Sequence, residues 1–513
     1  MYKLLLCWRY LRTRYIALVS IISVTLGVAT MIVVNSVMAG FSHEMQDRIQ
    51  GILSDLVFES HSMEGFADAK FHEEEIRKVA GDKIAGMTPC VVVPAMLSFR
   101  VGGNWVTRQV NLIGVDEKTH NQVSDFGCYL QHPENRKKLS FMLHDGGYDT
   151  RDHQGGSDAA DRPQMRAAGW QHRRWGVQRE KAFELPREAV EDAPASDENP
   201  FLNKSRDPFA SQAAAGSQDA EDEFDPETDQ STGIVLGMAL TSFRDQKGND
   251  RFLALPGDDV KITLPSSGTP PKAVSDTFTV VDFYESKMSE YDSSFVFVPI
   301  DKLQQLRGMI DPSTGIGNVT SIQIKLKNPA DGDEVRNKLR AVFPPQVYGI
   351  STWKDKQGPL LAAVAMETAI LNVLLFLIIA VAGFGILAIF FMIVVEKTKD
   401  IGILKSLGAP ARGVMGIFLA YGFSLGIVGA GAGAISGILF VVYINEIASG
   451  IGWLTGEPVF DPQIYYFQRI PTIIEPFTVA WVAVGAVLIA VAASALPARR
   501  AARLHPVEAL RYE

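Results

Sequence analysis

Four long runs of apolar residues, each nearly free of charged side chains, dominate the pattern of this chain. They cover residues 16–39, 369–395, 414–444 and 477–497. A helix needs about 20 apolar residues to cross a hydrocarbon core about 30 Å thick, and each run is long enough. The pattern therefore predicts four transmembrane helices, with a large polar segment between the first and the second.

Lysine and arginine residues cluster beside these runs, and short loops rich in positive charge stay in the cytoplasm. The clusters are Lys3, Arg9, Arg12 and Arg14, then Lys397, Lys399, Lys405 and Arg412, and finally Arg499, Arg500, Arg503 and Arg511. Alternating spans put all three clusters on one side. We expect both termini (1–15 and 498–513) and the connector 396–412 in the cytoplasm, with 40–365 and 446–475 outside. A secretory signal is the alternative interpretation of the first run, which is long for a signal core.

The outer segment 40–365 changes character along its length. Residues 54–130 and 319–352 each combine strand and helix patterns, which predicts one α+β lobe built from two distant pieces. Residues 233–300 alternate like strands and predict a β-rich lobe. Residues 133–231 are rich in Asp, Glu, Arg, Gln, Ser and Gly, and we interpret them as a largely disordered insert. The predicted fold class is an α-helical membrane protein with a large α+β extracytoplasmic domain.

The connector between the second and third runs carries apolar residues at helical spacing. Ile401, Leu404 and Leu407 recur every three residues among lysines. Such spacing places them along one face of a short helix. This face is a candidate docking surface for a partner.

Small residues recur in the third run at intervals of four or three: Gly422, Gly426, Gly429, Gly433 and Gly437. Glycines at this spacing let membrane helices approach closely. Packing among the chain's own spans and a dimer seam are both compatible with this pattern.

Composition limits the remaining function classes. The chain is 47% hydrophobic and 21% charged, and its net charge of −9 argues against a nucleic-acid partner. It has no Gly-x-x-x-x-Gly-Lys-Ser/Thr phosphate loop and no spaced Cys/His metal cluster, so we predict a non-catalytic protein without metal ligands. Cys90 and Cys128 would both lie outside, where either a disulfide or two free thiols would fit.

Two segments carry a resemblance to a known family. The block Glu396-Lys-Thr-Lys-Asp-Ile-Gly-Ile-Leu-Lys-Ser-Leu-Gly-Ala409 and the terminus from Leu496-Pro-Ala-Arg-Arg to Tyr512-Glu513 resemble the signatures of FtsX/MacB/LolC/LolE-type permeases, the type VII ABC transporters. Within that family the lipoprotein-releasing LolC/LolE branch looks closest. Segments that resemble it include Gly114-Val-Asp116, Gly233-Ile-Val-Leu-Gly237 and Pro256-Gly-Asp-Asp-Val260.

The resemblance implies a bacterial inner-membrane permease that works as a dimer, with a second copy or a paralogue, and with separate cytoplasmic ATPase subunits. ATP and Mg would be bound by those ATPases, and this chain would bind no cofactor directly. The outer domain would combine a porter-like lobe with the β-rich lobe and handle lipoproteins and a periplasmic carrier. The connector would be the coupling helix, through residues Glu396, Lys397, Lys399, Ile401, Gly402, Leu404, Lys405, Leu407 and Gly408.

One loop departs from the LolC pattern. The joint Leu264 to Lys272, with Pro265, Pro270 and Pro271, should project from the β-rich lobe as a candidate carrier or substrate loop, but it is shorter than the arm of LolC. A LolE-like chain and a homodimer serving both roles therefore stay open. A MacB-like export permease and an FtsX-like activator of cell-wall hydrolases are the alternative functions.

Overall fold

The computed structural model describes residues 15–154, 161–184, 224–245, 249–455 and 469–505. The chain forms two compact units, one from residues up to Ile49 and from Gln357 onward, the other from Gln50–Lys356. Parts of three predicted segments lie outside the described residues: the N-terminal residues 1–14, the connector residues 456–468 and the tail residues 506–513.

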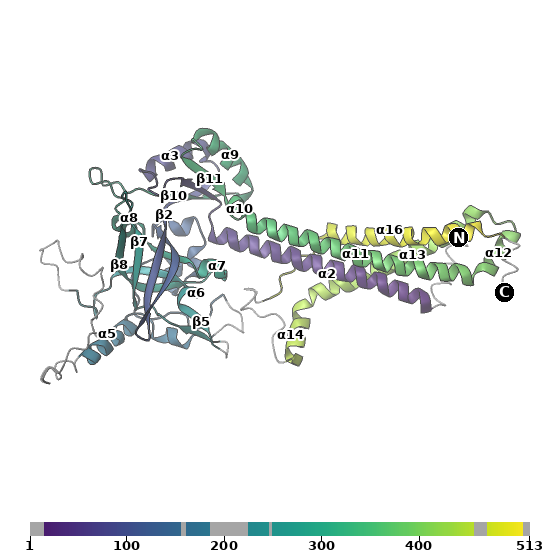
Figure 1. Cartoon of the computed structure of the whole chain (residues 1–513), viewed down its shortest axis with the longest axis horizontal. Helices are drawn as coiled ribbons and strands as arrows, with labels where there is room; N and C mark the ends of the chain where they lie inside the picture. The colour runs from purple at the N-terminus through teal and green to yellow at the C-terminus, as the bar shows by residue number, and fades with distance from the viewer. Residues whose placement is uncertain (1–14, 155–160, 185–223, 246–248, 456–468, 506–513) are drawn as a thin grey trace, which may run out of the picture. The chain divides into compact units, whose positions relative to one another are not determined.

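The first unit is helical (Figure 1). Its described helices are α2 (Tyr15–Ile52, whose last three residues fall in the second unit), α11 (Gly358–Glu396), α12 (Thr398–Ser406), α13 (Ala411–Val442), α14 (Ile444–Thr455) and α16 (Pro476–Arg503). Four of them, α2, α11, α13 and α16, are long and apolar enough to cross a membrane. Each contains one of the four apolar runs almost entirely, because in an apolar environment a continuous helix satisfies the backbone hydrogen bonds within the segment itself.

Two of these helices are much longer than a bilayer requires. α2 has 38 residues and α11 has 39, which at 1.5 Å per residue gives each a length of about 57 Å. A contact between His43 and Asp47 and an ion pair between Glu44 and Arg48 mark the polar end of α2. These helices therefore extend beyond their apolar runs.

The second unit is built on one nine-stranded sheet, in the order β11-β1-β10-β2-β3-β9-β4-β8-β7. Most neighbours are antiparallel, and β3 with β9 and β4 with β8 are parallel. The strands are β1 (Leu56–Ser60), β2 (Ile84–Val101), β3 (Asn104–Val115), β4 (Thr232–Gly237), β7 (Asp259–Pro265), β8 (Ala273–Tyr284), β9 (Phe295–Pro299), β10 (Ser321–Leu326) and β11 (Tyr348–Thr352). A separate two-stranded sheet joins β5 (Ser242–Arg244) and β6 (Asp250–Phe252).

The 18-residue strand β2 joins the two predicted lobes into one sheet. Its first half pairs with β10, and its second half pairs with both β3 and β7. Pairing of Met96 with Thr263 closes a ring of strands β2, β3, β9, β4, β8 and β7. The tight hairpin between β2 and β3 turns at Gly102 and Gly103, whose φ angles of 57° and 91° glycine adopts without strain.

Helices α3 (Ala69–Ala80) and α9 (Gly332–Val342) belong to the part of the sheet formed by β1, β10 and β11 (Figure 1). Both are amphipathic, and they bury Ile76, Ala80, Val335 and Leu339 in the core of this unit. Asp68 caps α3 by accepting a hydrogen bond from the Phe71 amide at 3.1 Å. The remaining described helices of this unit include α6 (Met238–Thr241), α7 (Ser289–Asp292), α8 (Ile300–Arg307) and α10 (Trp353–Lys356).

The prediction of a disordered insert is wrong for much of the described part of residues 133–231. Helices α4 (Pro133–Lys137) and α5 (Trp170–Glu184) form there, and Met165 and Ala168 join the core. Arg162 is completely buried and donates to Asp250 at 2.9 Å and Glu285 at 2.7 Å. The composition of the insert did not predict this burial of Arg162, because the carboxylates that neutralise it come from distant parts of the chain. Residues 155–160 and 185–223 of the insert lie outside the described part.

Candidate functional site

The charged connector folds as the short helix α12, with a sharp stop at its end. After α11 ends at Glu396, Lys397 caps both helices, and α12 begins at Thr398. Gly408 has a φ of 91°, and the Ala409 amide donates to the Leu404 carbonyl oxygen at 3.1 Å. This is the Schellman arrangement that a glycine after a helix permits. Gly408, predicted as a coupling residue, thus sets where α12 ends.

The two sides of α12 have different surroundings. Thr398, Ile401 and Gly402 are buried, and Ile401 packs in the apolar core of the helical unit. Leu404 is 40% exposed and Leu407 is 80% exposed. The predicted apolar docking face is therefore wrong at Ile401, because the chain's own spans already cover it. Ile403, which is 49% exposed, lies on the exposed side of α12 together with Leu404 and Leu407.

Lys405, predicted as a coupling residue, lies on the inward side of α12. Its ammonium donates to the main-chain oxygens of Ala502 at 2.9 Å and Leu504 at 2.6 Å. These carbonyls stand at the C-terminal end of α16, where backbone oxygens lack helical partners and the helix dipole favours a cation. Lys405 thereby connects the two sequence segments that resemble the permease signatures.

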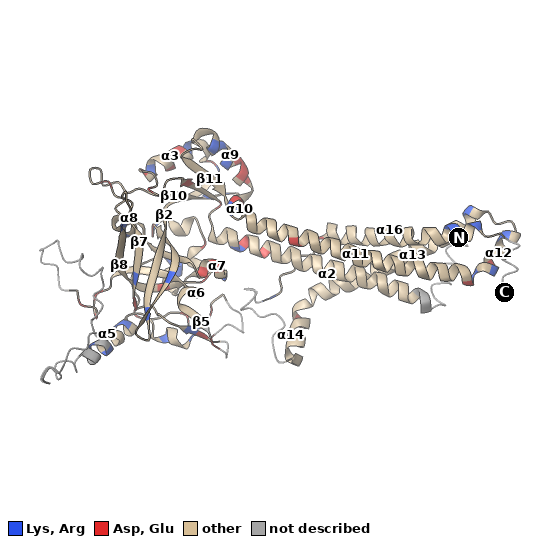
Figure 2. Cartoon of the chain, viewed as in Figure 1, with Lys and Arg blue, Asp and Glu red and all other residues tan. Residues whose placement is uncertain are grey.

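The other charged residues predicted for coupling remain near the surface. Lys397 pairs with Asp400 at 2.7 Å across one turn, while Glu396 and Lys399 are exposed. Lysine and arginine residues gather at this end of the helices, around α12 and the end of α16 (Figure 2). This end therefore presents positive charge together with the exposed Leu404 and Leu407.

All five glycines of α13 face other helices of the same chain. A Cβ atom at Gly429 or Gly433 would lie 2.8 Å from Val24 Cβ or 2.7 Å from Val28 Cβ, both on α2. Gly437 is also next to α2, at Ala29 and Ile32, whereas Gly422 and Gly426 lie against α16, at Ser494 and Ala490. The glycine pattern therefore packs α13 between two of its own spans.

The loop predicted to contact a carrier or substrate connects β7 and β8. Pro265 ends β7, and Pro270 and Pro271 precede Ala273, where β8 begins. Pro265 and Pro271 line an open hollow of about 300 Å³ together with Pro94 and Met96 of β2. The hollow is mainly apolar.

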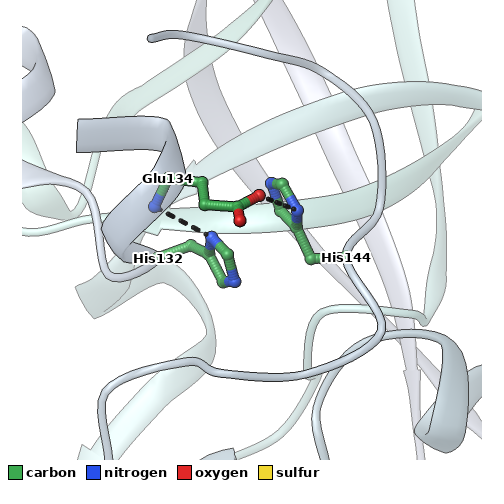
Figure 3. Close-up of side chains that lie close together, drawn as sticks. All are labelled: His132, Glu134 and His144. Atoms are coloured by element: carbon green, nitrogen blue, oxygen red, sulfur yellow. Dashed lines mark hydrogen bonds and ion pairs between the residues drawn. The ribbon is translucent and has the colours of Figure 1, made fainter. Parts of the chain in front are cut away.

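Three potential metal-ligating side chains that the sequence did not reveal lie together at the start of the insert (Figure 3). Ligand atoms of His132, Glu134 and His144 lie within 4.8 Å of one another. The two imidazole rings are stacked, with centroids 3.8 Å apart and planes 4° from parallel. Nitrogen lone pairs lie in the ring planes, so two parallel rings cannot both aim at one ion between them. The group as arranged is a packing contact, and burial lowers the pKa of His144, which favours its neutral form.

Cys90 and Cys128 are both free thiols in the structure. Cys90 is fully buried, and burial raises the pKa of its thiol to about 12. A thiol that stays protonated is a poor nucleophile. Of the two alternatives left open by the sequence, the structure has free thiols.

Part of this helical unit matches a known protein family. Residues 372–506 match the family described as FtsX-like permease C-terminal. This region includes α12, α13, α14, α16 and most of α11, and therefore both the exposed face of α12 and the Lys405 contact.

Similar proteins extend the match beyond that domain. The chain is 30% identical over 260 residues to the lipoprotein-releasing system transmembrane protein LolC of Xylella fastidiosa, a match covering 50% of this chain and 61% of that protein. It is 28% identical over 192 residues to the lipoprotein-releasing system transmembrane protein LolE of Haemophilus influenzae, a match covering 37% of this chain and 46% of that protein. It is 26% identical over 209 residues to the macrolide export ATP-binding/permease protein MacB of Bdellovibrio bacteriovorus, a match covering 39% of this chain and 29% of that protein. The chain thus spans less than two thirds of the length of these relatives. With its FtsX-like domain and four apolar helices, the chain is similar to membrane permeases of the FtsX/MacB/LolC–LolE type.

Proposed function

We propose that the chain is the non-catalytic permease subunit of an ABC transporter, driven by a separate cytoplasmic ATPase and acting in lipoprotein release from the inner membrane. The observation that carries this proposal is the two-sided burial of α12. One side is fixed to the chain's own helices through Ile401 and Lys405, while Ile403, Leu404 and Leu407 are exposed on the other.

An exposed apolar patch on a short helix among lysines suits insertion into a groove of a partner. Because Lys405 holds α12 to the end of α16, a push on α12 would act directly on a span. α11 and α2 are continuous helices, so rigid-body movement of the helical unit would reach the residues that follow α2 and those that precede α11. ATP and Mg would be bound by the ATPase, and both termini and α12 would lie on the cytoplasmic side.

Lipoproteins are the proposed substrate because two of the similar proteins described above carry a lipoprotein-releasing name. A second permease, as a copy or a paralogue, would complete the transporter. Since the five glycines of α13 already face α2 and α16, the dimer contact would use other surfaces.

The test is purification of the tagged full chain from membranes of its own organism, with identification of bound proteins by mass spectrometry. We expect the wild type to retain an ABC ATPase and the variant Leu404→Asp to lose it, because a carboxylate cannot enter an apolar groove without a large desolvation cost. Leu404→Met keeps an apolar side chain and should retain the ATPase. Ser406→Asp, exposed on a different side of α12, controls for added charge and should also retain it.

Equal recovery of the ATPase with Leu404→Asp would overturn the coupling role of α12. The substrate is tested by ATP-dependent release of a purified lipoprotein from proteoliposomes that contain the complex. ATP hydrolysis without release, together with recovery of an efflux channel or a cell-wall hydrolase, would assign the complex to the export or signalling class.

A further inference from the structure

Helix α14 has an apolar stripe along one side, and it turns away from α13 at the end of that helix (Figure 1). Ile444, Ile447, Ile451 and Leu454 recur at intervals of three, four and three, so they lie on one face of the helix. Asn445, Glu446 and Ser449 lie on the opposite face. Glu446 is the one charged residue among the twelve of this helix.

The stripe becomes more exposed as α14 leaves the other helices. Ile444 is 9% exposed, Ile451 is 44% exposed and Leu454 is 79% exposed. The described part of the chain therefore leaves the second half of the stripe uncovered. An apolar stripe of this kind, in a helix of low charge, calls for an apolar environment.

The position of α14 along the spans identifies that environment. Gly437 of α13 lies against Ile32 of α2, and Gly433 lies against Val28, so the two helices run in the same direction. Five residues beyond Gly437, α13 ends at Val442, which is level with about Val37 on α2. The polar side-chain pairs of α2 begin at His43, about 1.7 turns further on. The start of α14 is thus level with the transition from apolar to charged sequence.

The first residues of α16 also indicate a transition from apolar to polar surroundings. Phe477 and Trp481, in its first two turns, are 82% and 69% exposed, and aromatic residues gather where a span meets the membrane surface. Asn445 of α14 is also tied to the segment that leads into α16, because its side-chain oxygen accepts from the Ile470 amide at 2.8 Å. This bond fixes the first turn of α14 against that segment.

We propose that α14 is an interfacial helix that lies in the membrane surface at this end of α13, with Ile447, Ile451 and Leu454 toward the lipid acyl chains and Glu446 and Ser449 toward the headgroups and water. The partner is the bilayer itself. A span that continues directly into an amphipathic helix of low charge at the apolar-to-charged transition is suited to this arrangement. Such a helix would resist vertical movement of α13 and hold it at a fixed depth.

The inference rests on the membrane character of the chain and is independent of what the transporter handles. It is tested by spin labels on single cysteines in the full chain, reconstituted in liposomes of phosphatidylethanolamine and phosphatidylglycerol. Cys7 and Cys128 are replaced by serine, and the fully buried Cys90 stays as a background control. The labelled variants are Ile451→Cys and Leu454→Cys on the stripe, with Ser449→Cys as the matched polar position in the same helix.

The readout is the accessibility of each label to oxygen, which concentrates in lipid, and to a water-soluble nickel chelate. We expect at least a several-fold higher ratio of oxygen to nickel accessibility at positions 451 and 454 than at 449. High nickel accessibility at all three positions would place α14 in water and overturn the proposal. Low accessibility to both reagents at 451 and 454 would show a protein contact, such as a second copy of the chain, and would also overturn it.

Discussion

The ammonium group of Lys405 donates a hydrogen bond of 2.6 Å to the main-chain oxygen of Leu504. It donates a second hydrogen bond to the main-chain oxygen of Ala502. One side chain therefore caps the C-terminal end of α16 and holds α12 against it. A nine-residue helix is too short to be stable in water alone. The order of α12 therefore depends on this contact and on the burial of Ile401.

Replacing Lys405 with Met should loosen α12 while keeping most of the apolar stem. A hydrogen bond that involves a charged group contributes about 1.5–3 kcal/mol, so amide hydrogens of residues 401–407 should exchange roughly ten- to a hundredfold faster. Hydrogen exchange followed by mass spectrometry of the full chain in detergent measures this. Lys399→Met removes an exposed lysine from the same helix and should change nothing. Equal protection in both variants would show that the Lys405 contact contributes no stability.

Close packing of α13 against α2 predicts opposite effects of one substitution at two neighbouring glycines. At Gly433 an added Cβ would lie 2.8 Å from the Thr25 carbonyl oxygen, whereas at Gly431 no atom lies within 4 Å among those the structure describes. Alanine gains up to about 1 kcal/mol over glycine in a helix. Gly431→Ala should therefore raise the thermal midpoint of the purified chain slightly, and Gly433→Ala should lower it. A rise in both would mean that α2 can move away without cost.

Burial of Arg162 predicts that the order of the described insert depends strongly on this side chain. Arg162→Gln removes the guanidinium that Asp250 and Glu285 share, and breaking one side of a buried ion pair costs about 3–5 kcal/mol. We expect a lower urea midpoint and faster trypsin cleavage within residues 161–184. Arg166→Gln, an exposed arginine four residues later, should behave like the wild type. Unchanged cleavage in Arg162→Gln would show that the Arg162 ion pairs are not needed to hold the insert in place.

The local pattern of apolar residues was sufficient to predict the four apolar helices, because a long uncharged apolar run is stable in a membrane as a helix. It also predicted the helix at the connector. It failed where burial depends on residues far apart in sequence. Ile401 repeats with Leu404 and Leu407, yet it is covered by other spans, and no spacing rule could show that. The carboxylate partners of Arg162 likewise lie 88 and 123 residues away, and the carbonyl partners of Lys405 lie 97 and 99 residues away, so only the folded chain brings them together.

Asp292 predicts how stability changes with pH in the second unit. Burial raises the pKa of its carboxyl group from an ordinary value of 3.8 to about 7, although Ser286 donates to it from both its amide and its hydroxyl. The folded state therefore binds a proton more tightly than the unfolded state does. This contribution to the free energy of unfolding is fully present below about pH 4 and is lost as pH rises through 7. A shift of three pKa units corresponds to at most about 4 kcal/mol.

The variant Asp292→Asn is neutral at every pH and should remove this contribution. Urea unfolding of the full chain at pH 4.5, 6.0 and 7.5 measures the effect, and the wild type should lose more stability than the variant across this range. Asp282 is a second buried carboxyl group, with its pKa raised to about 6, and it remains in both proteins. Its contribution therefore cancels in the comparison. Parallel curves for the wild type and Asp292→Asn would show that Asp292 ionises at a similar pH in the folded and unfolded chains, because bonds from Ser286 then offset its burial.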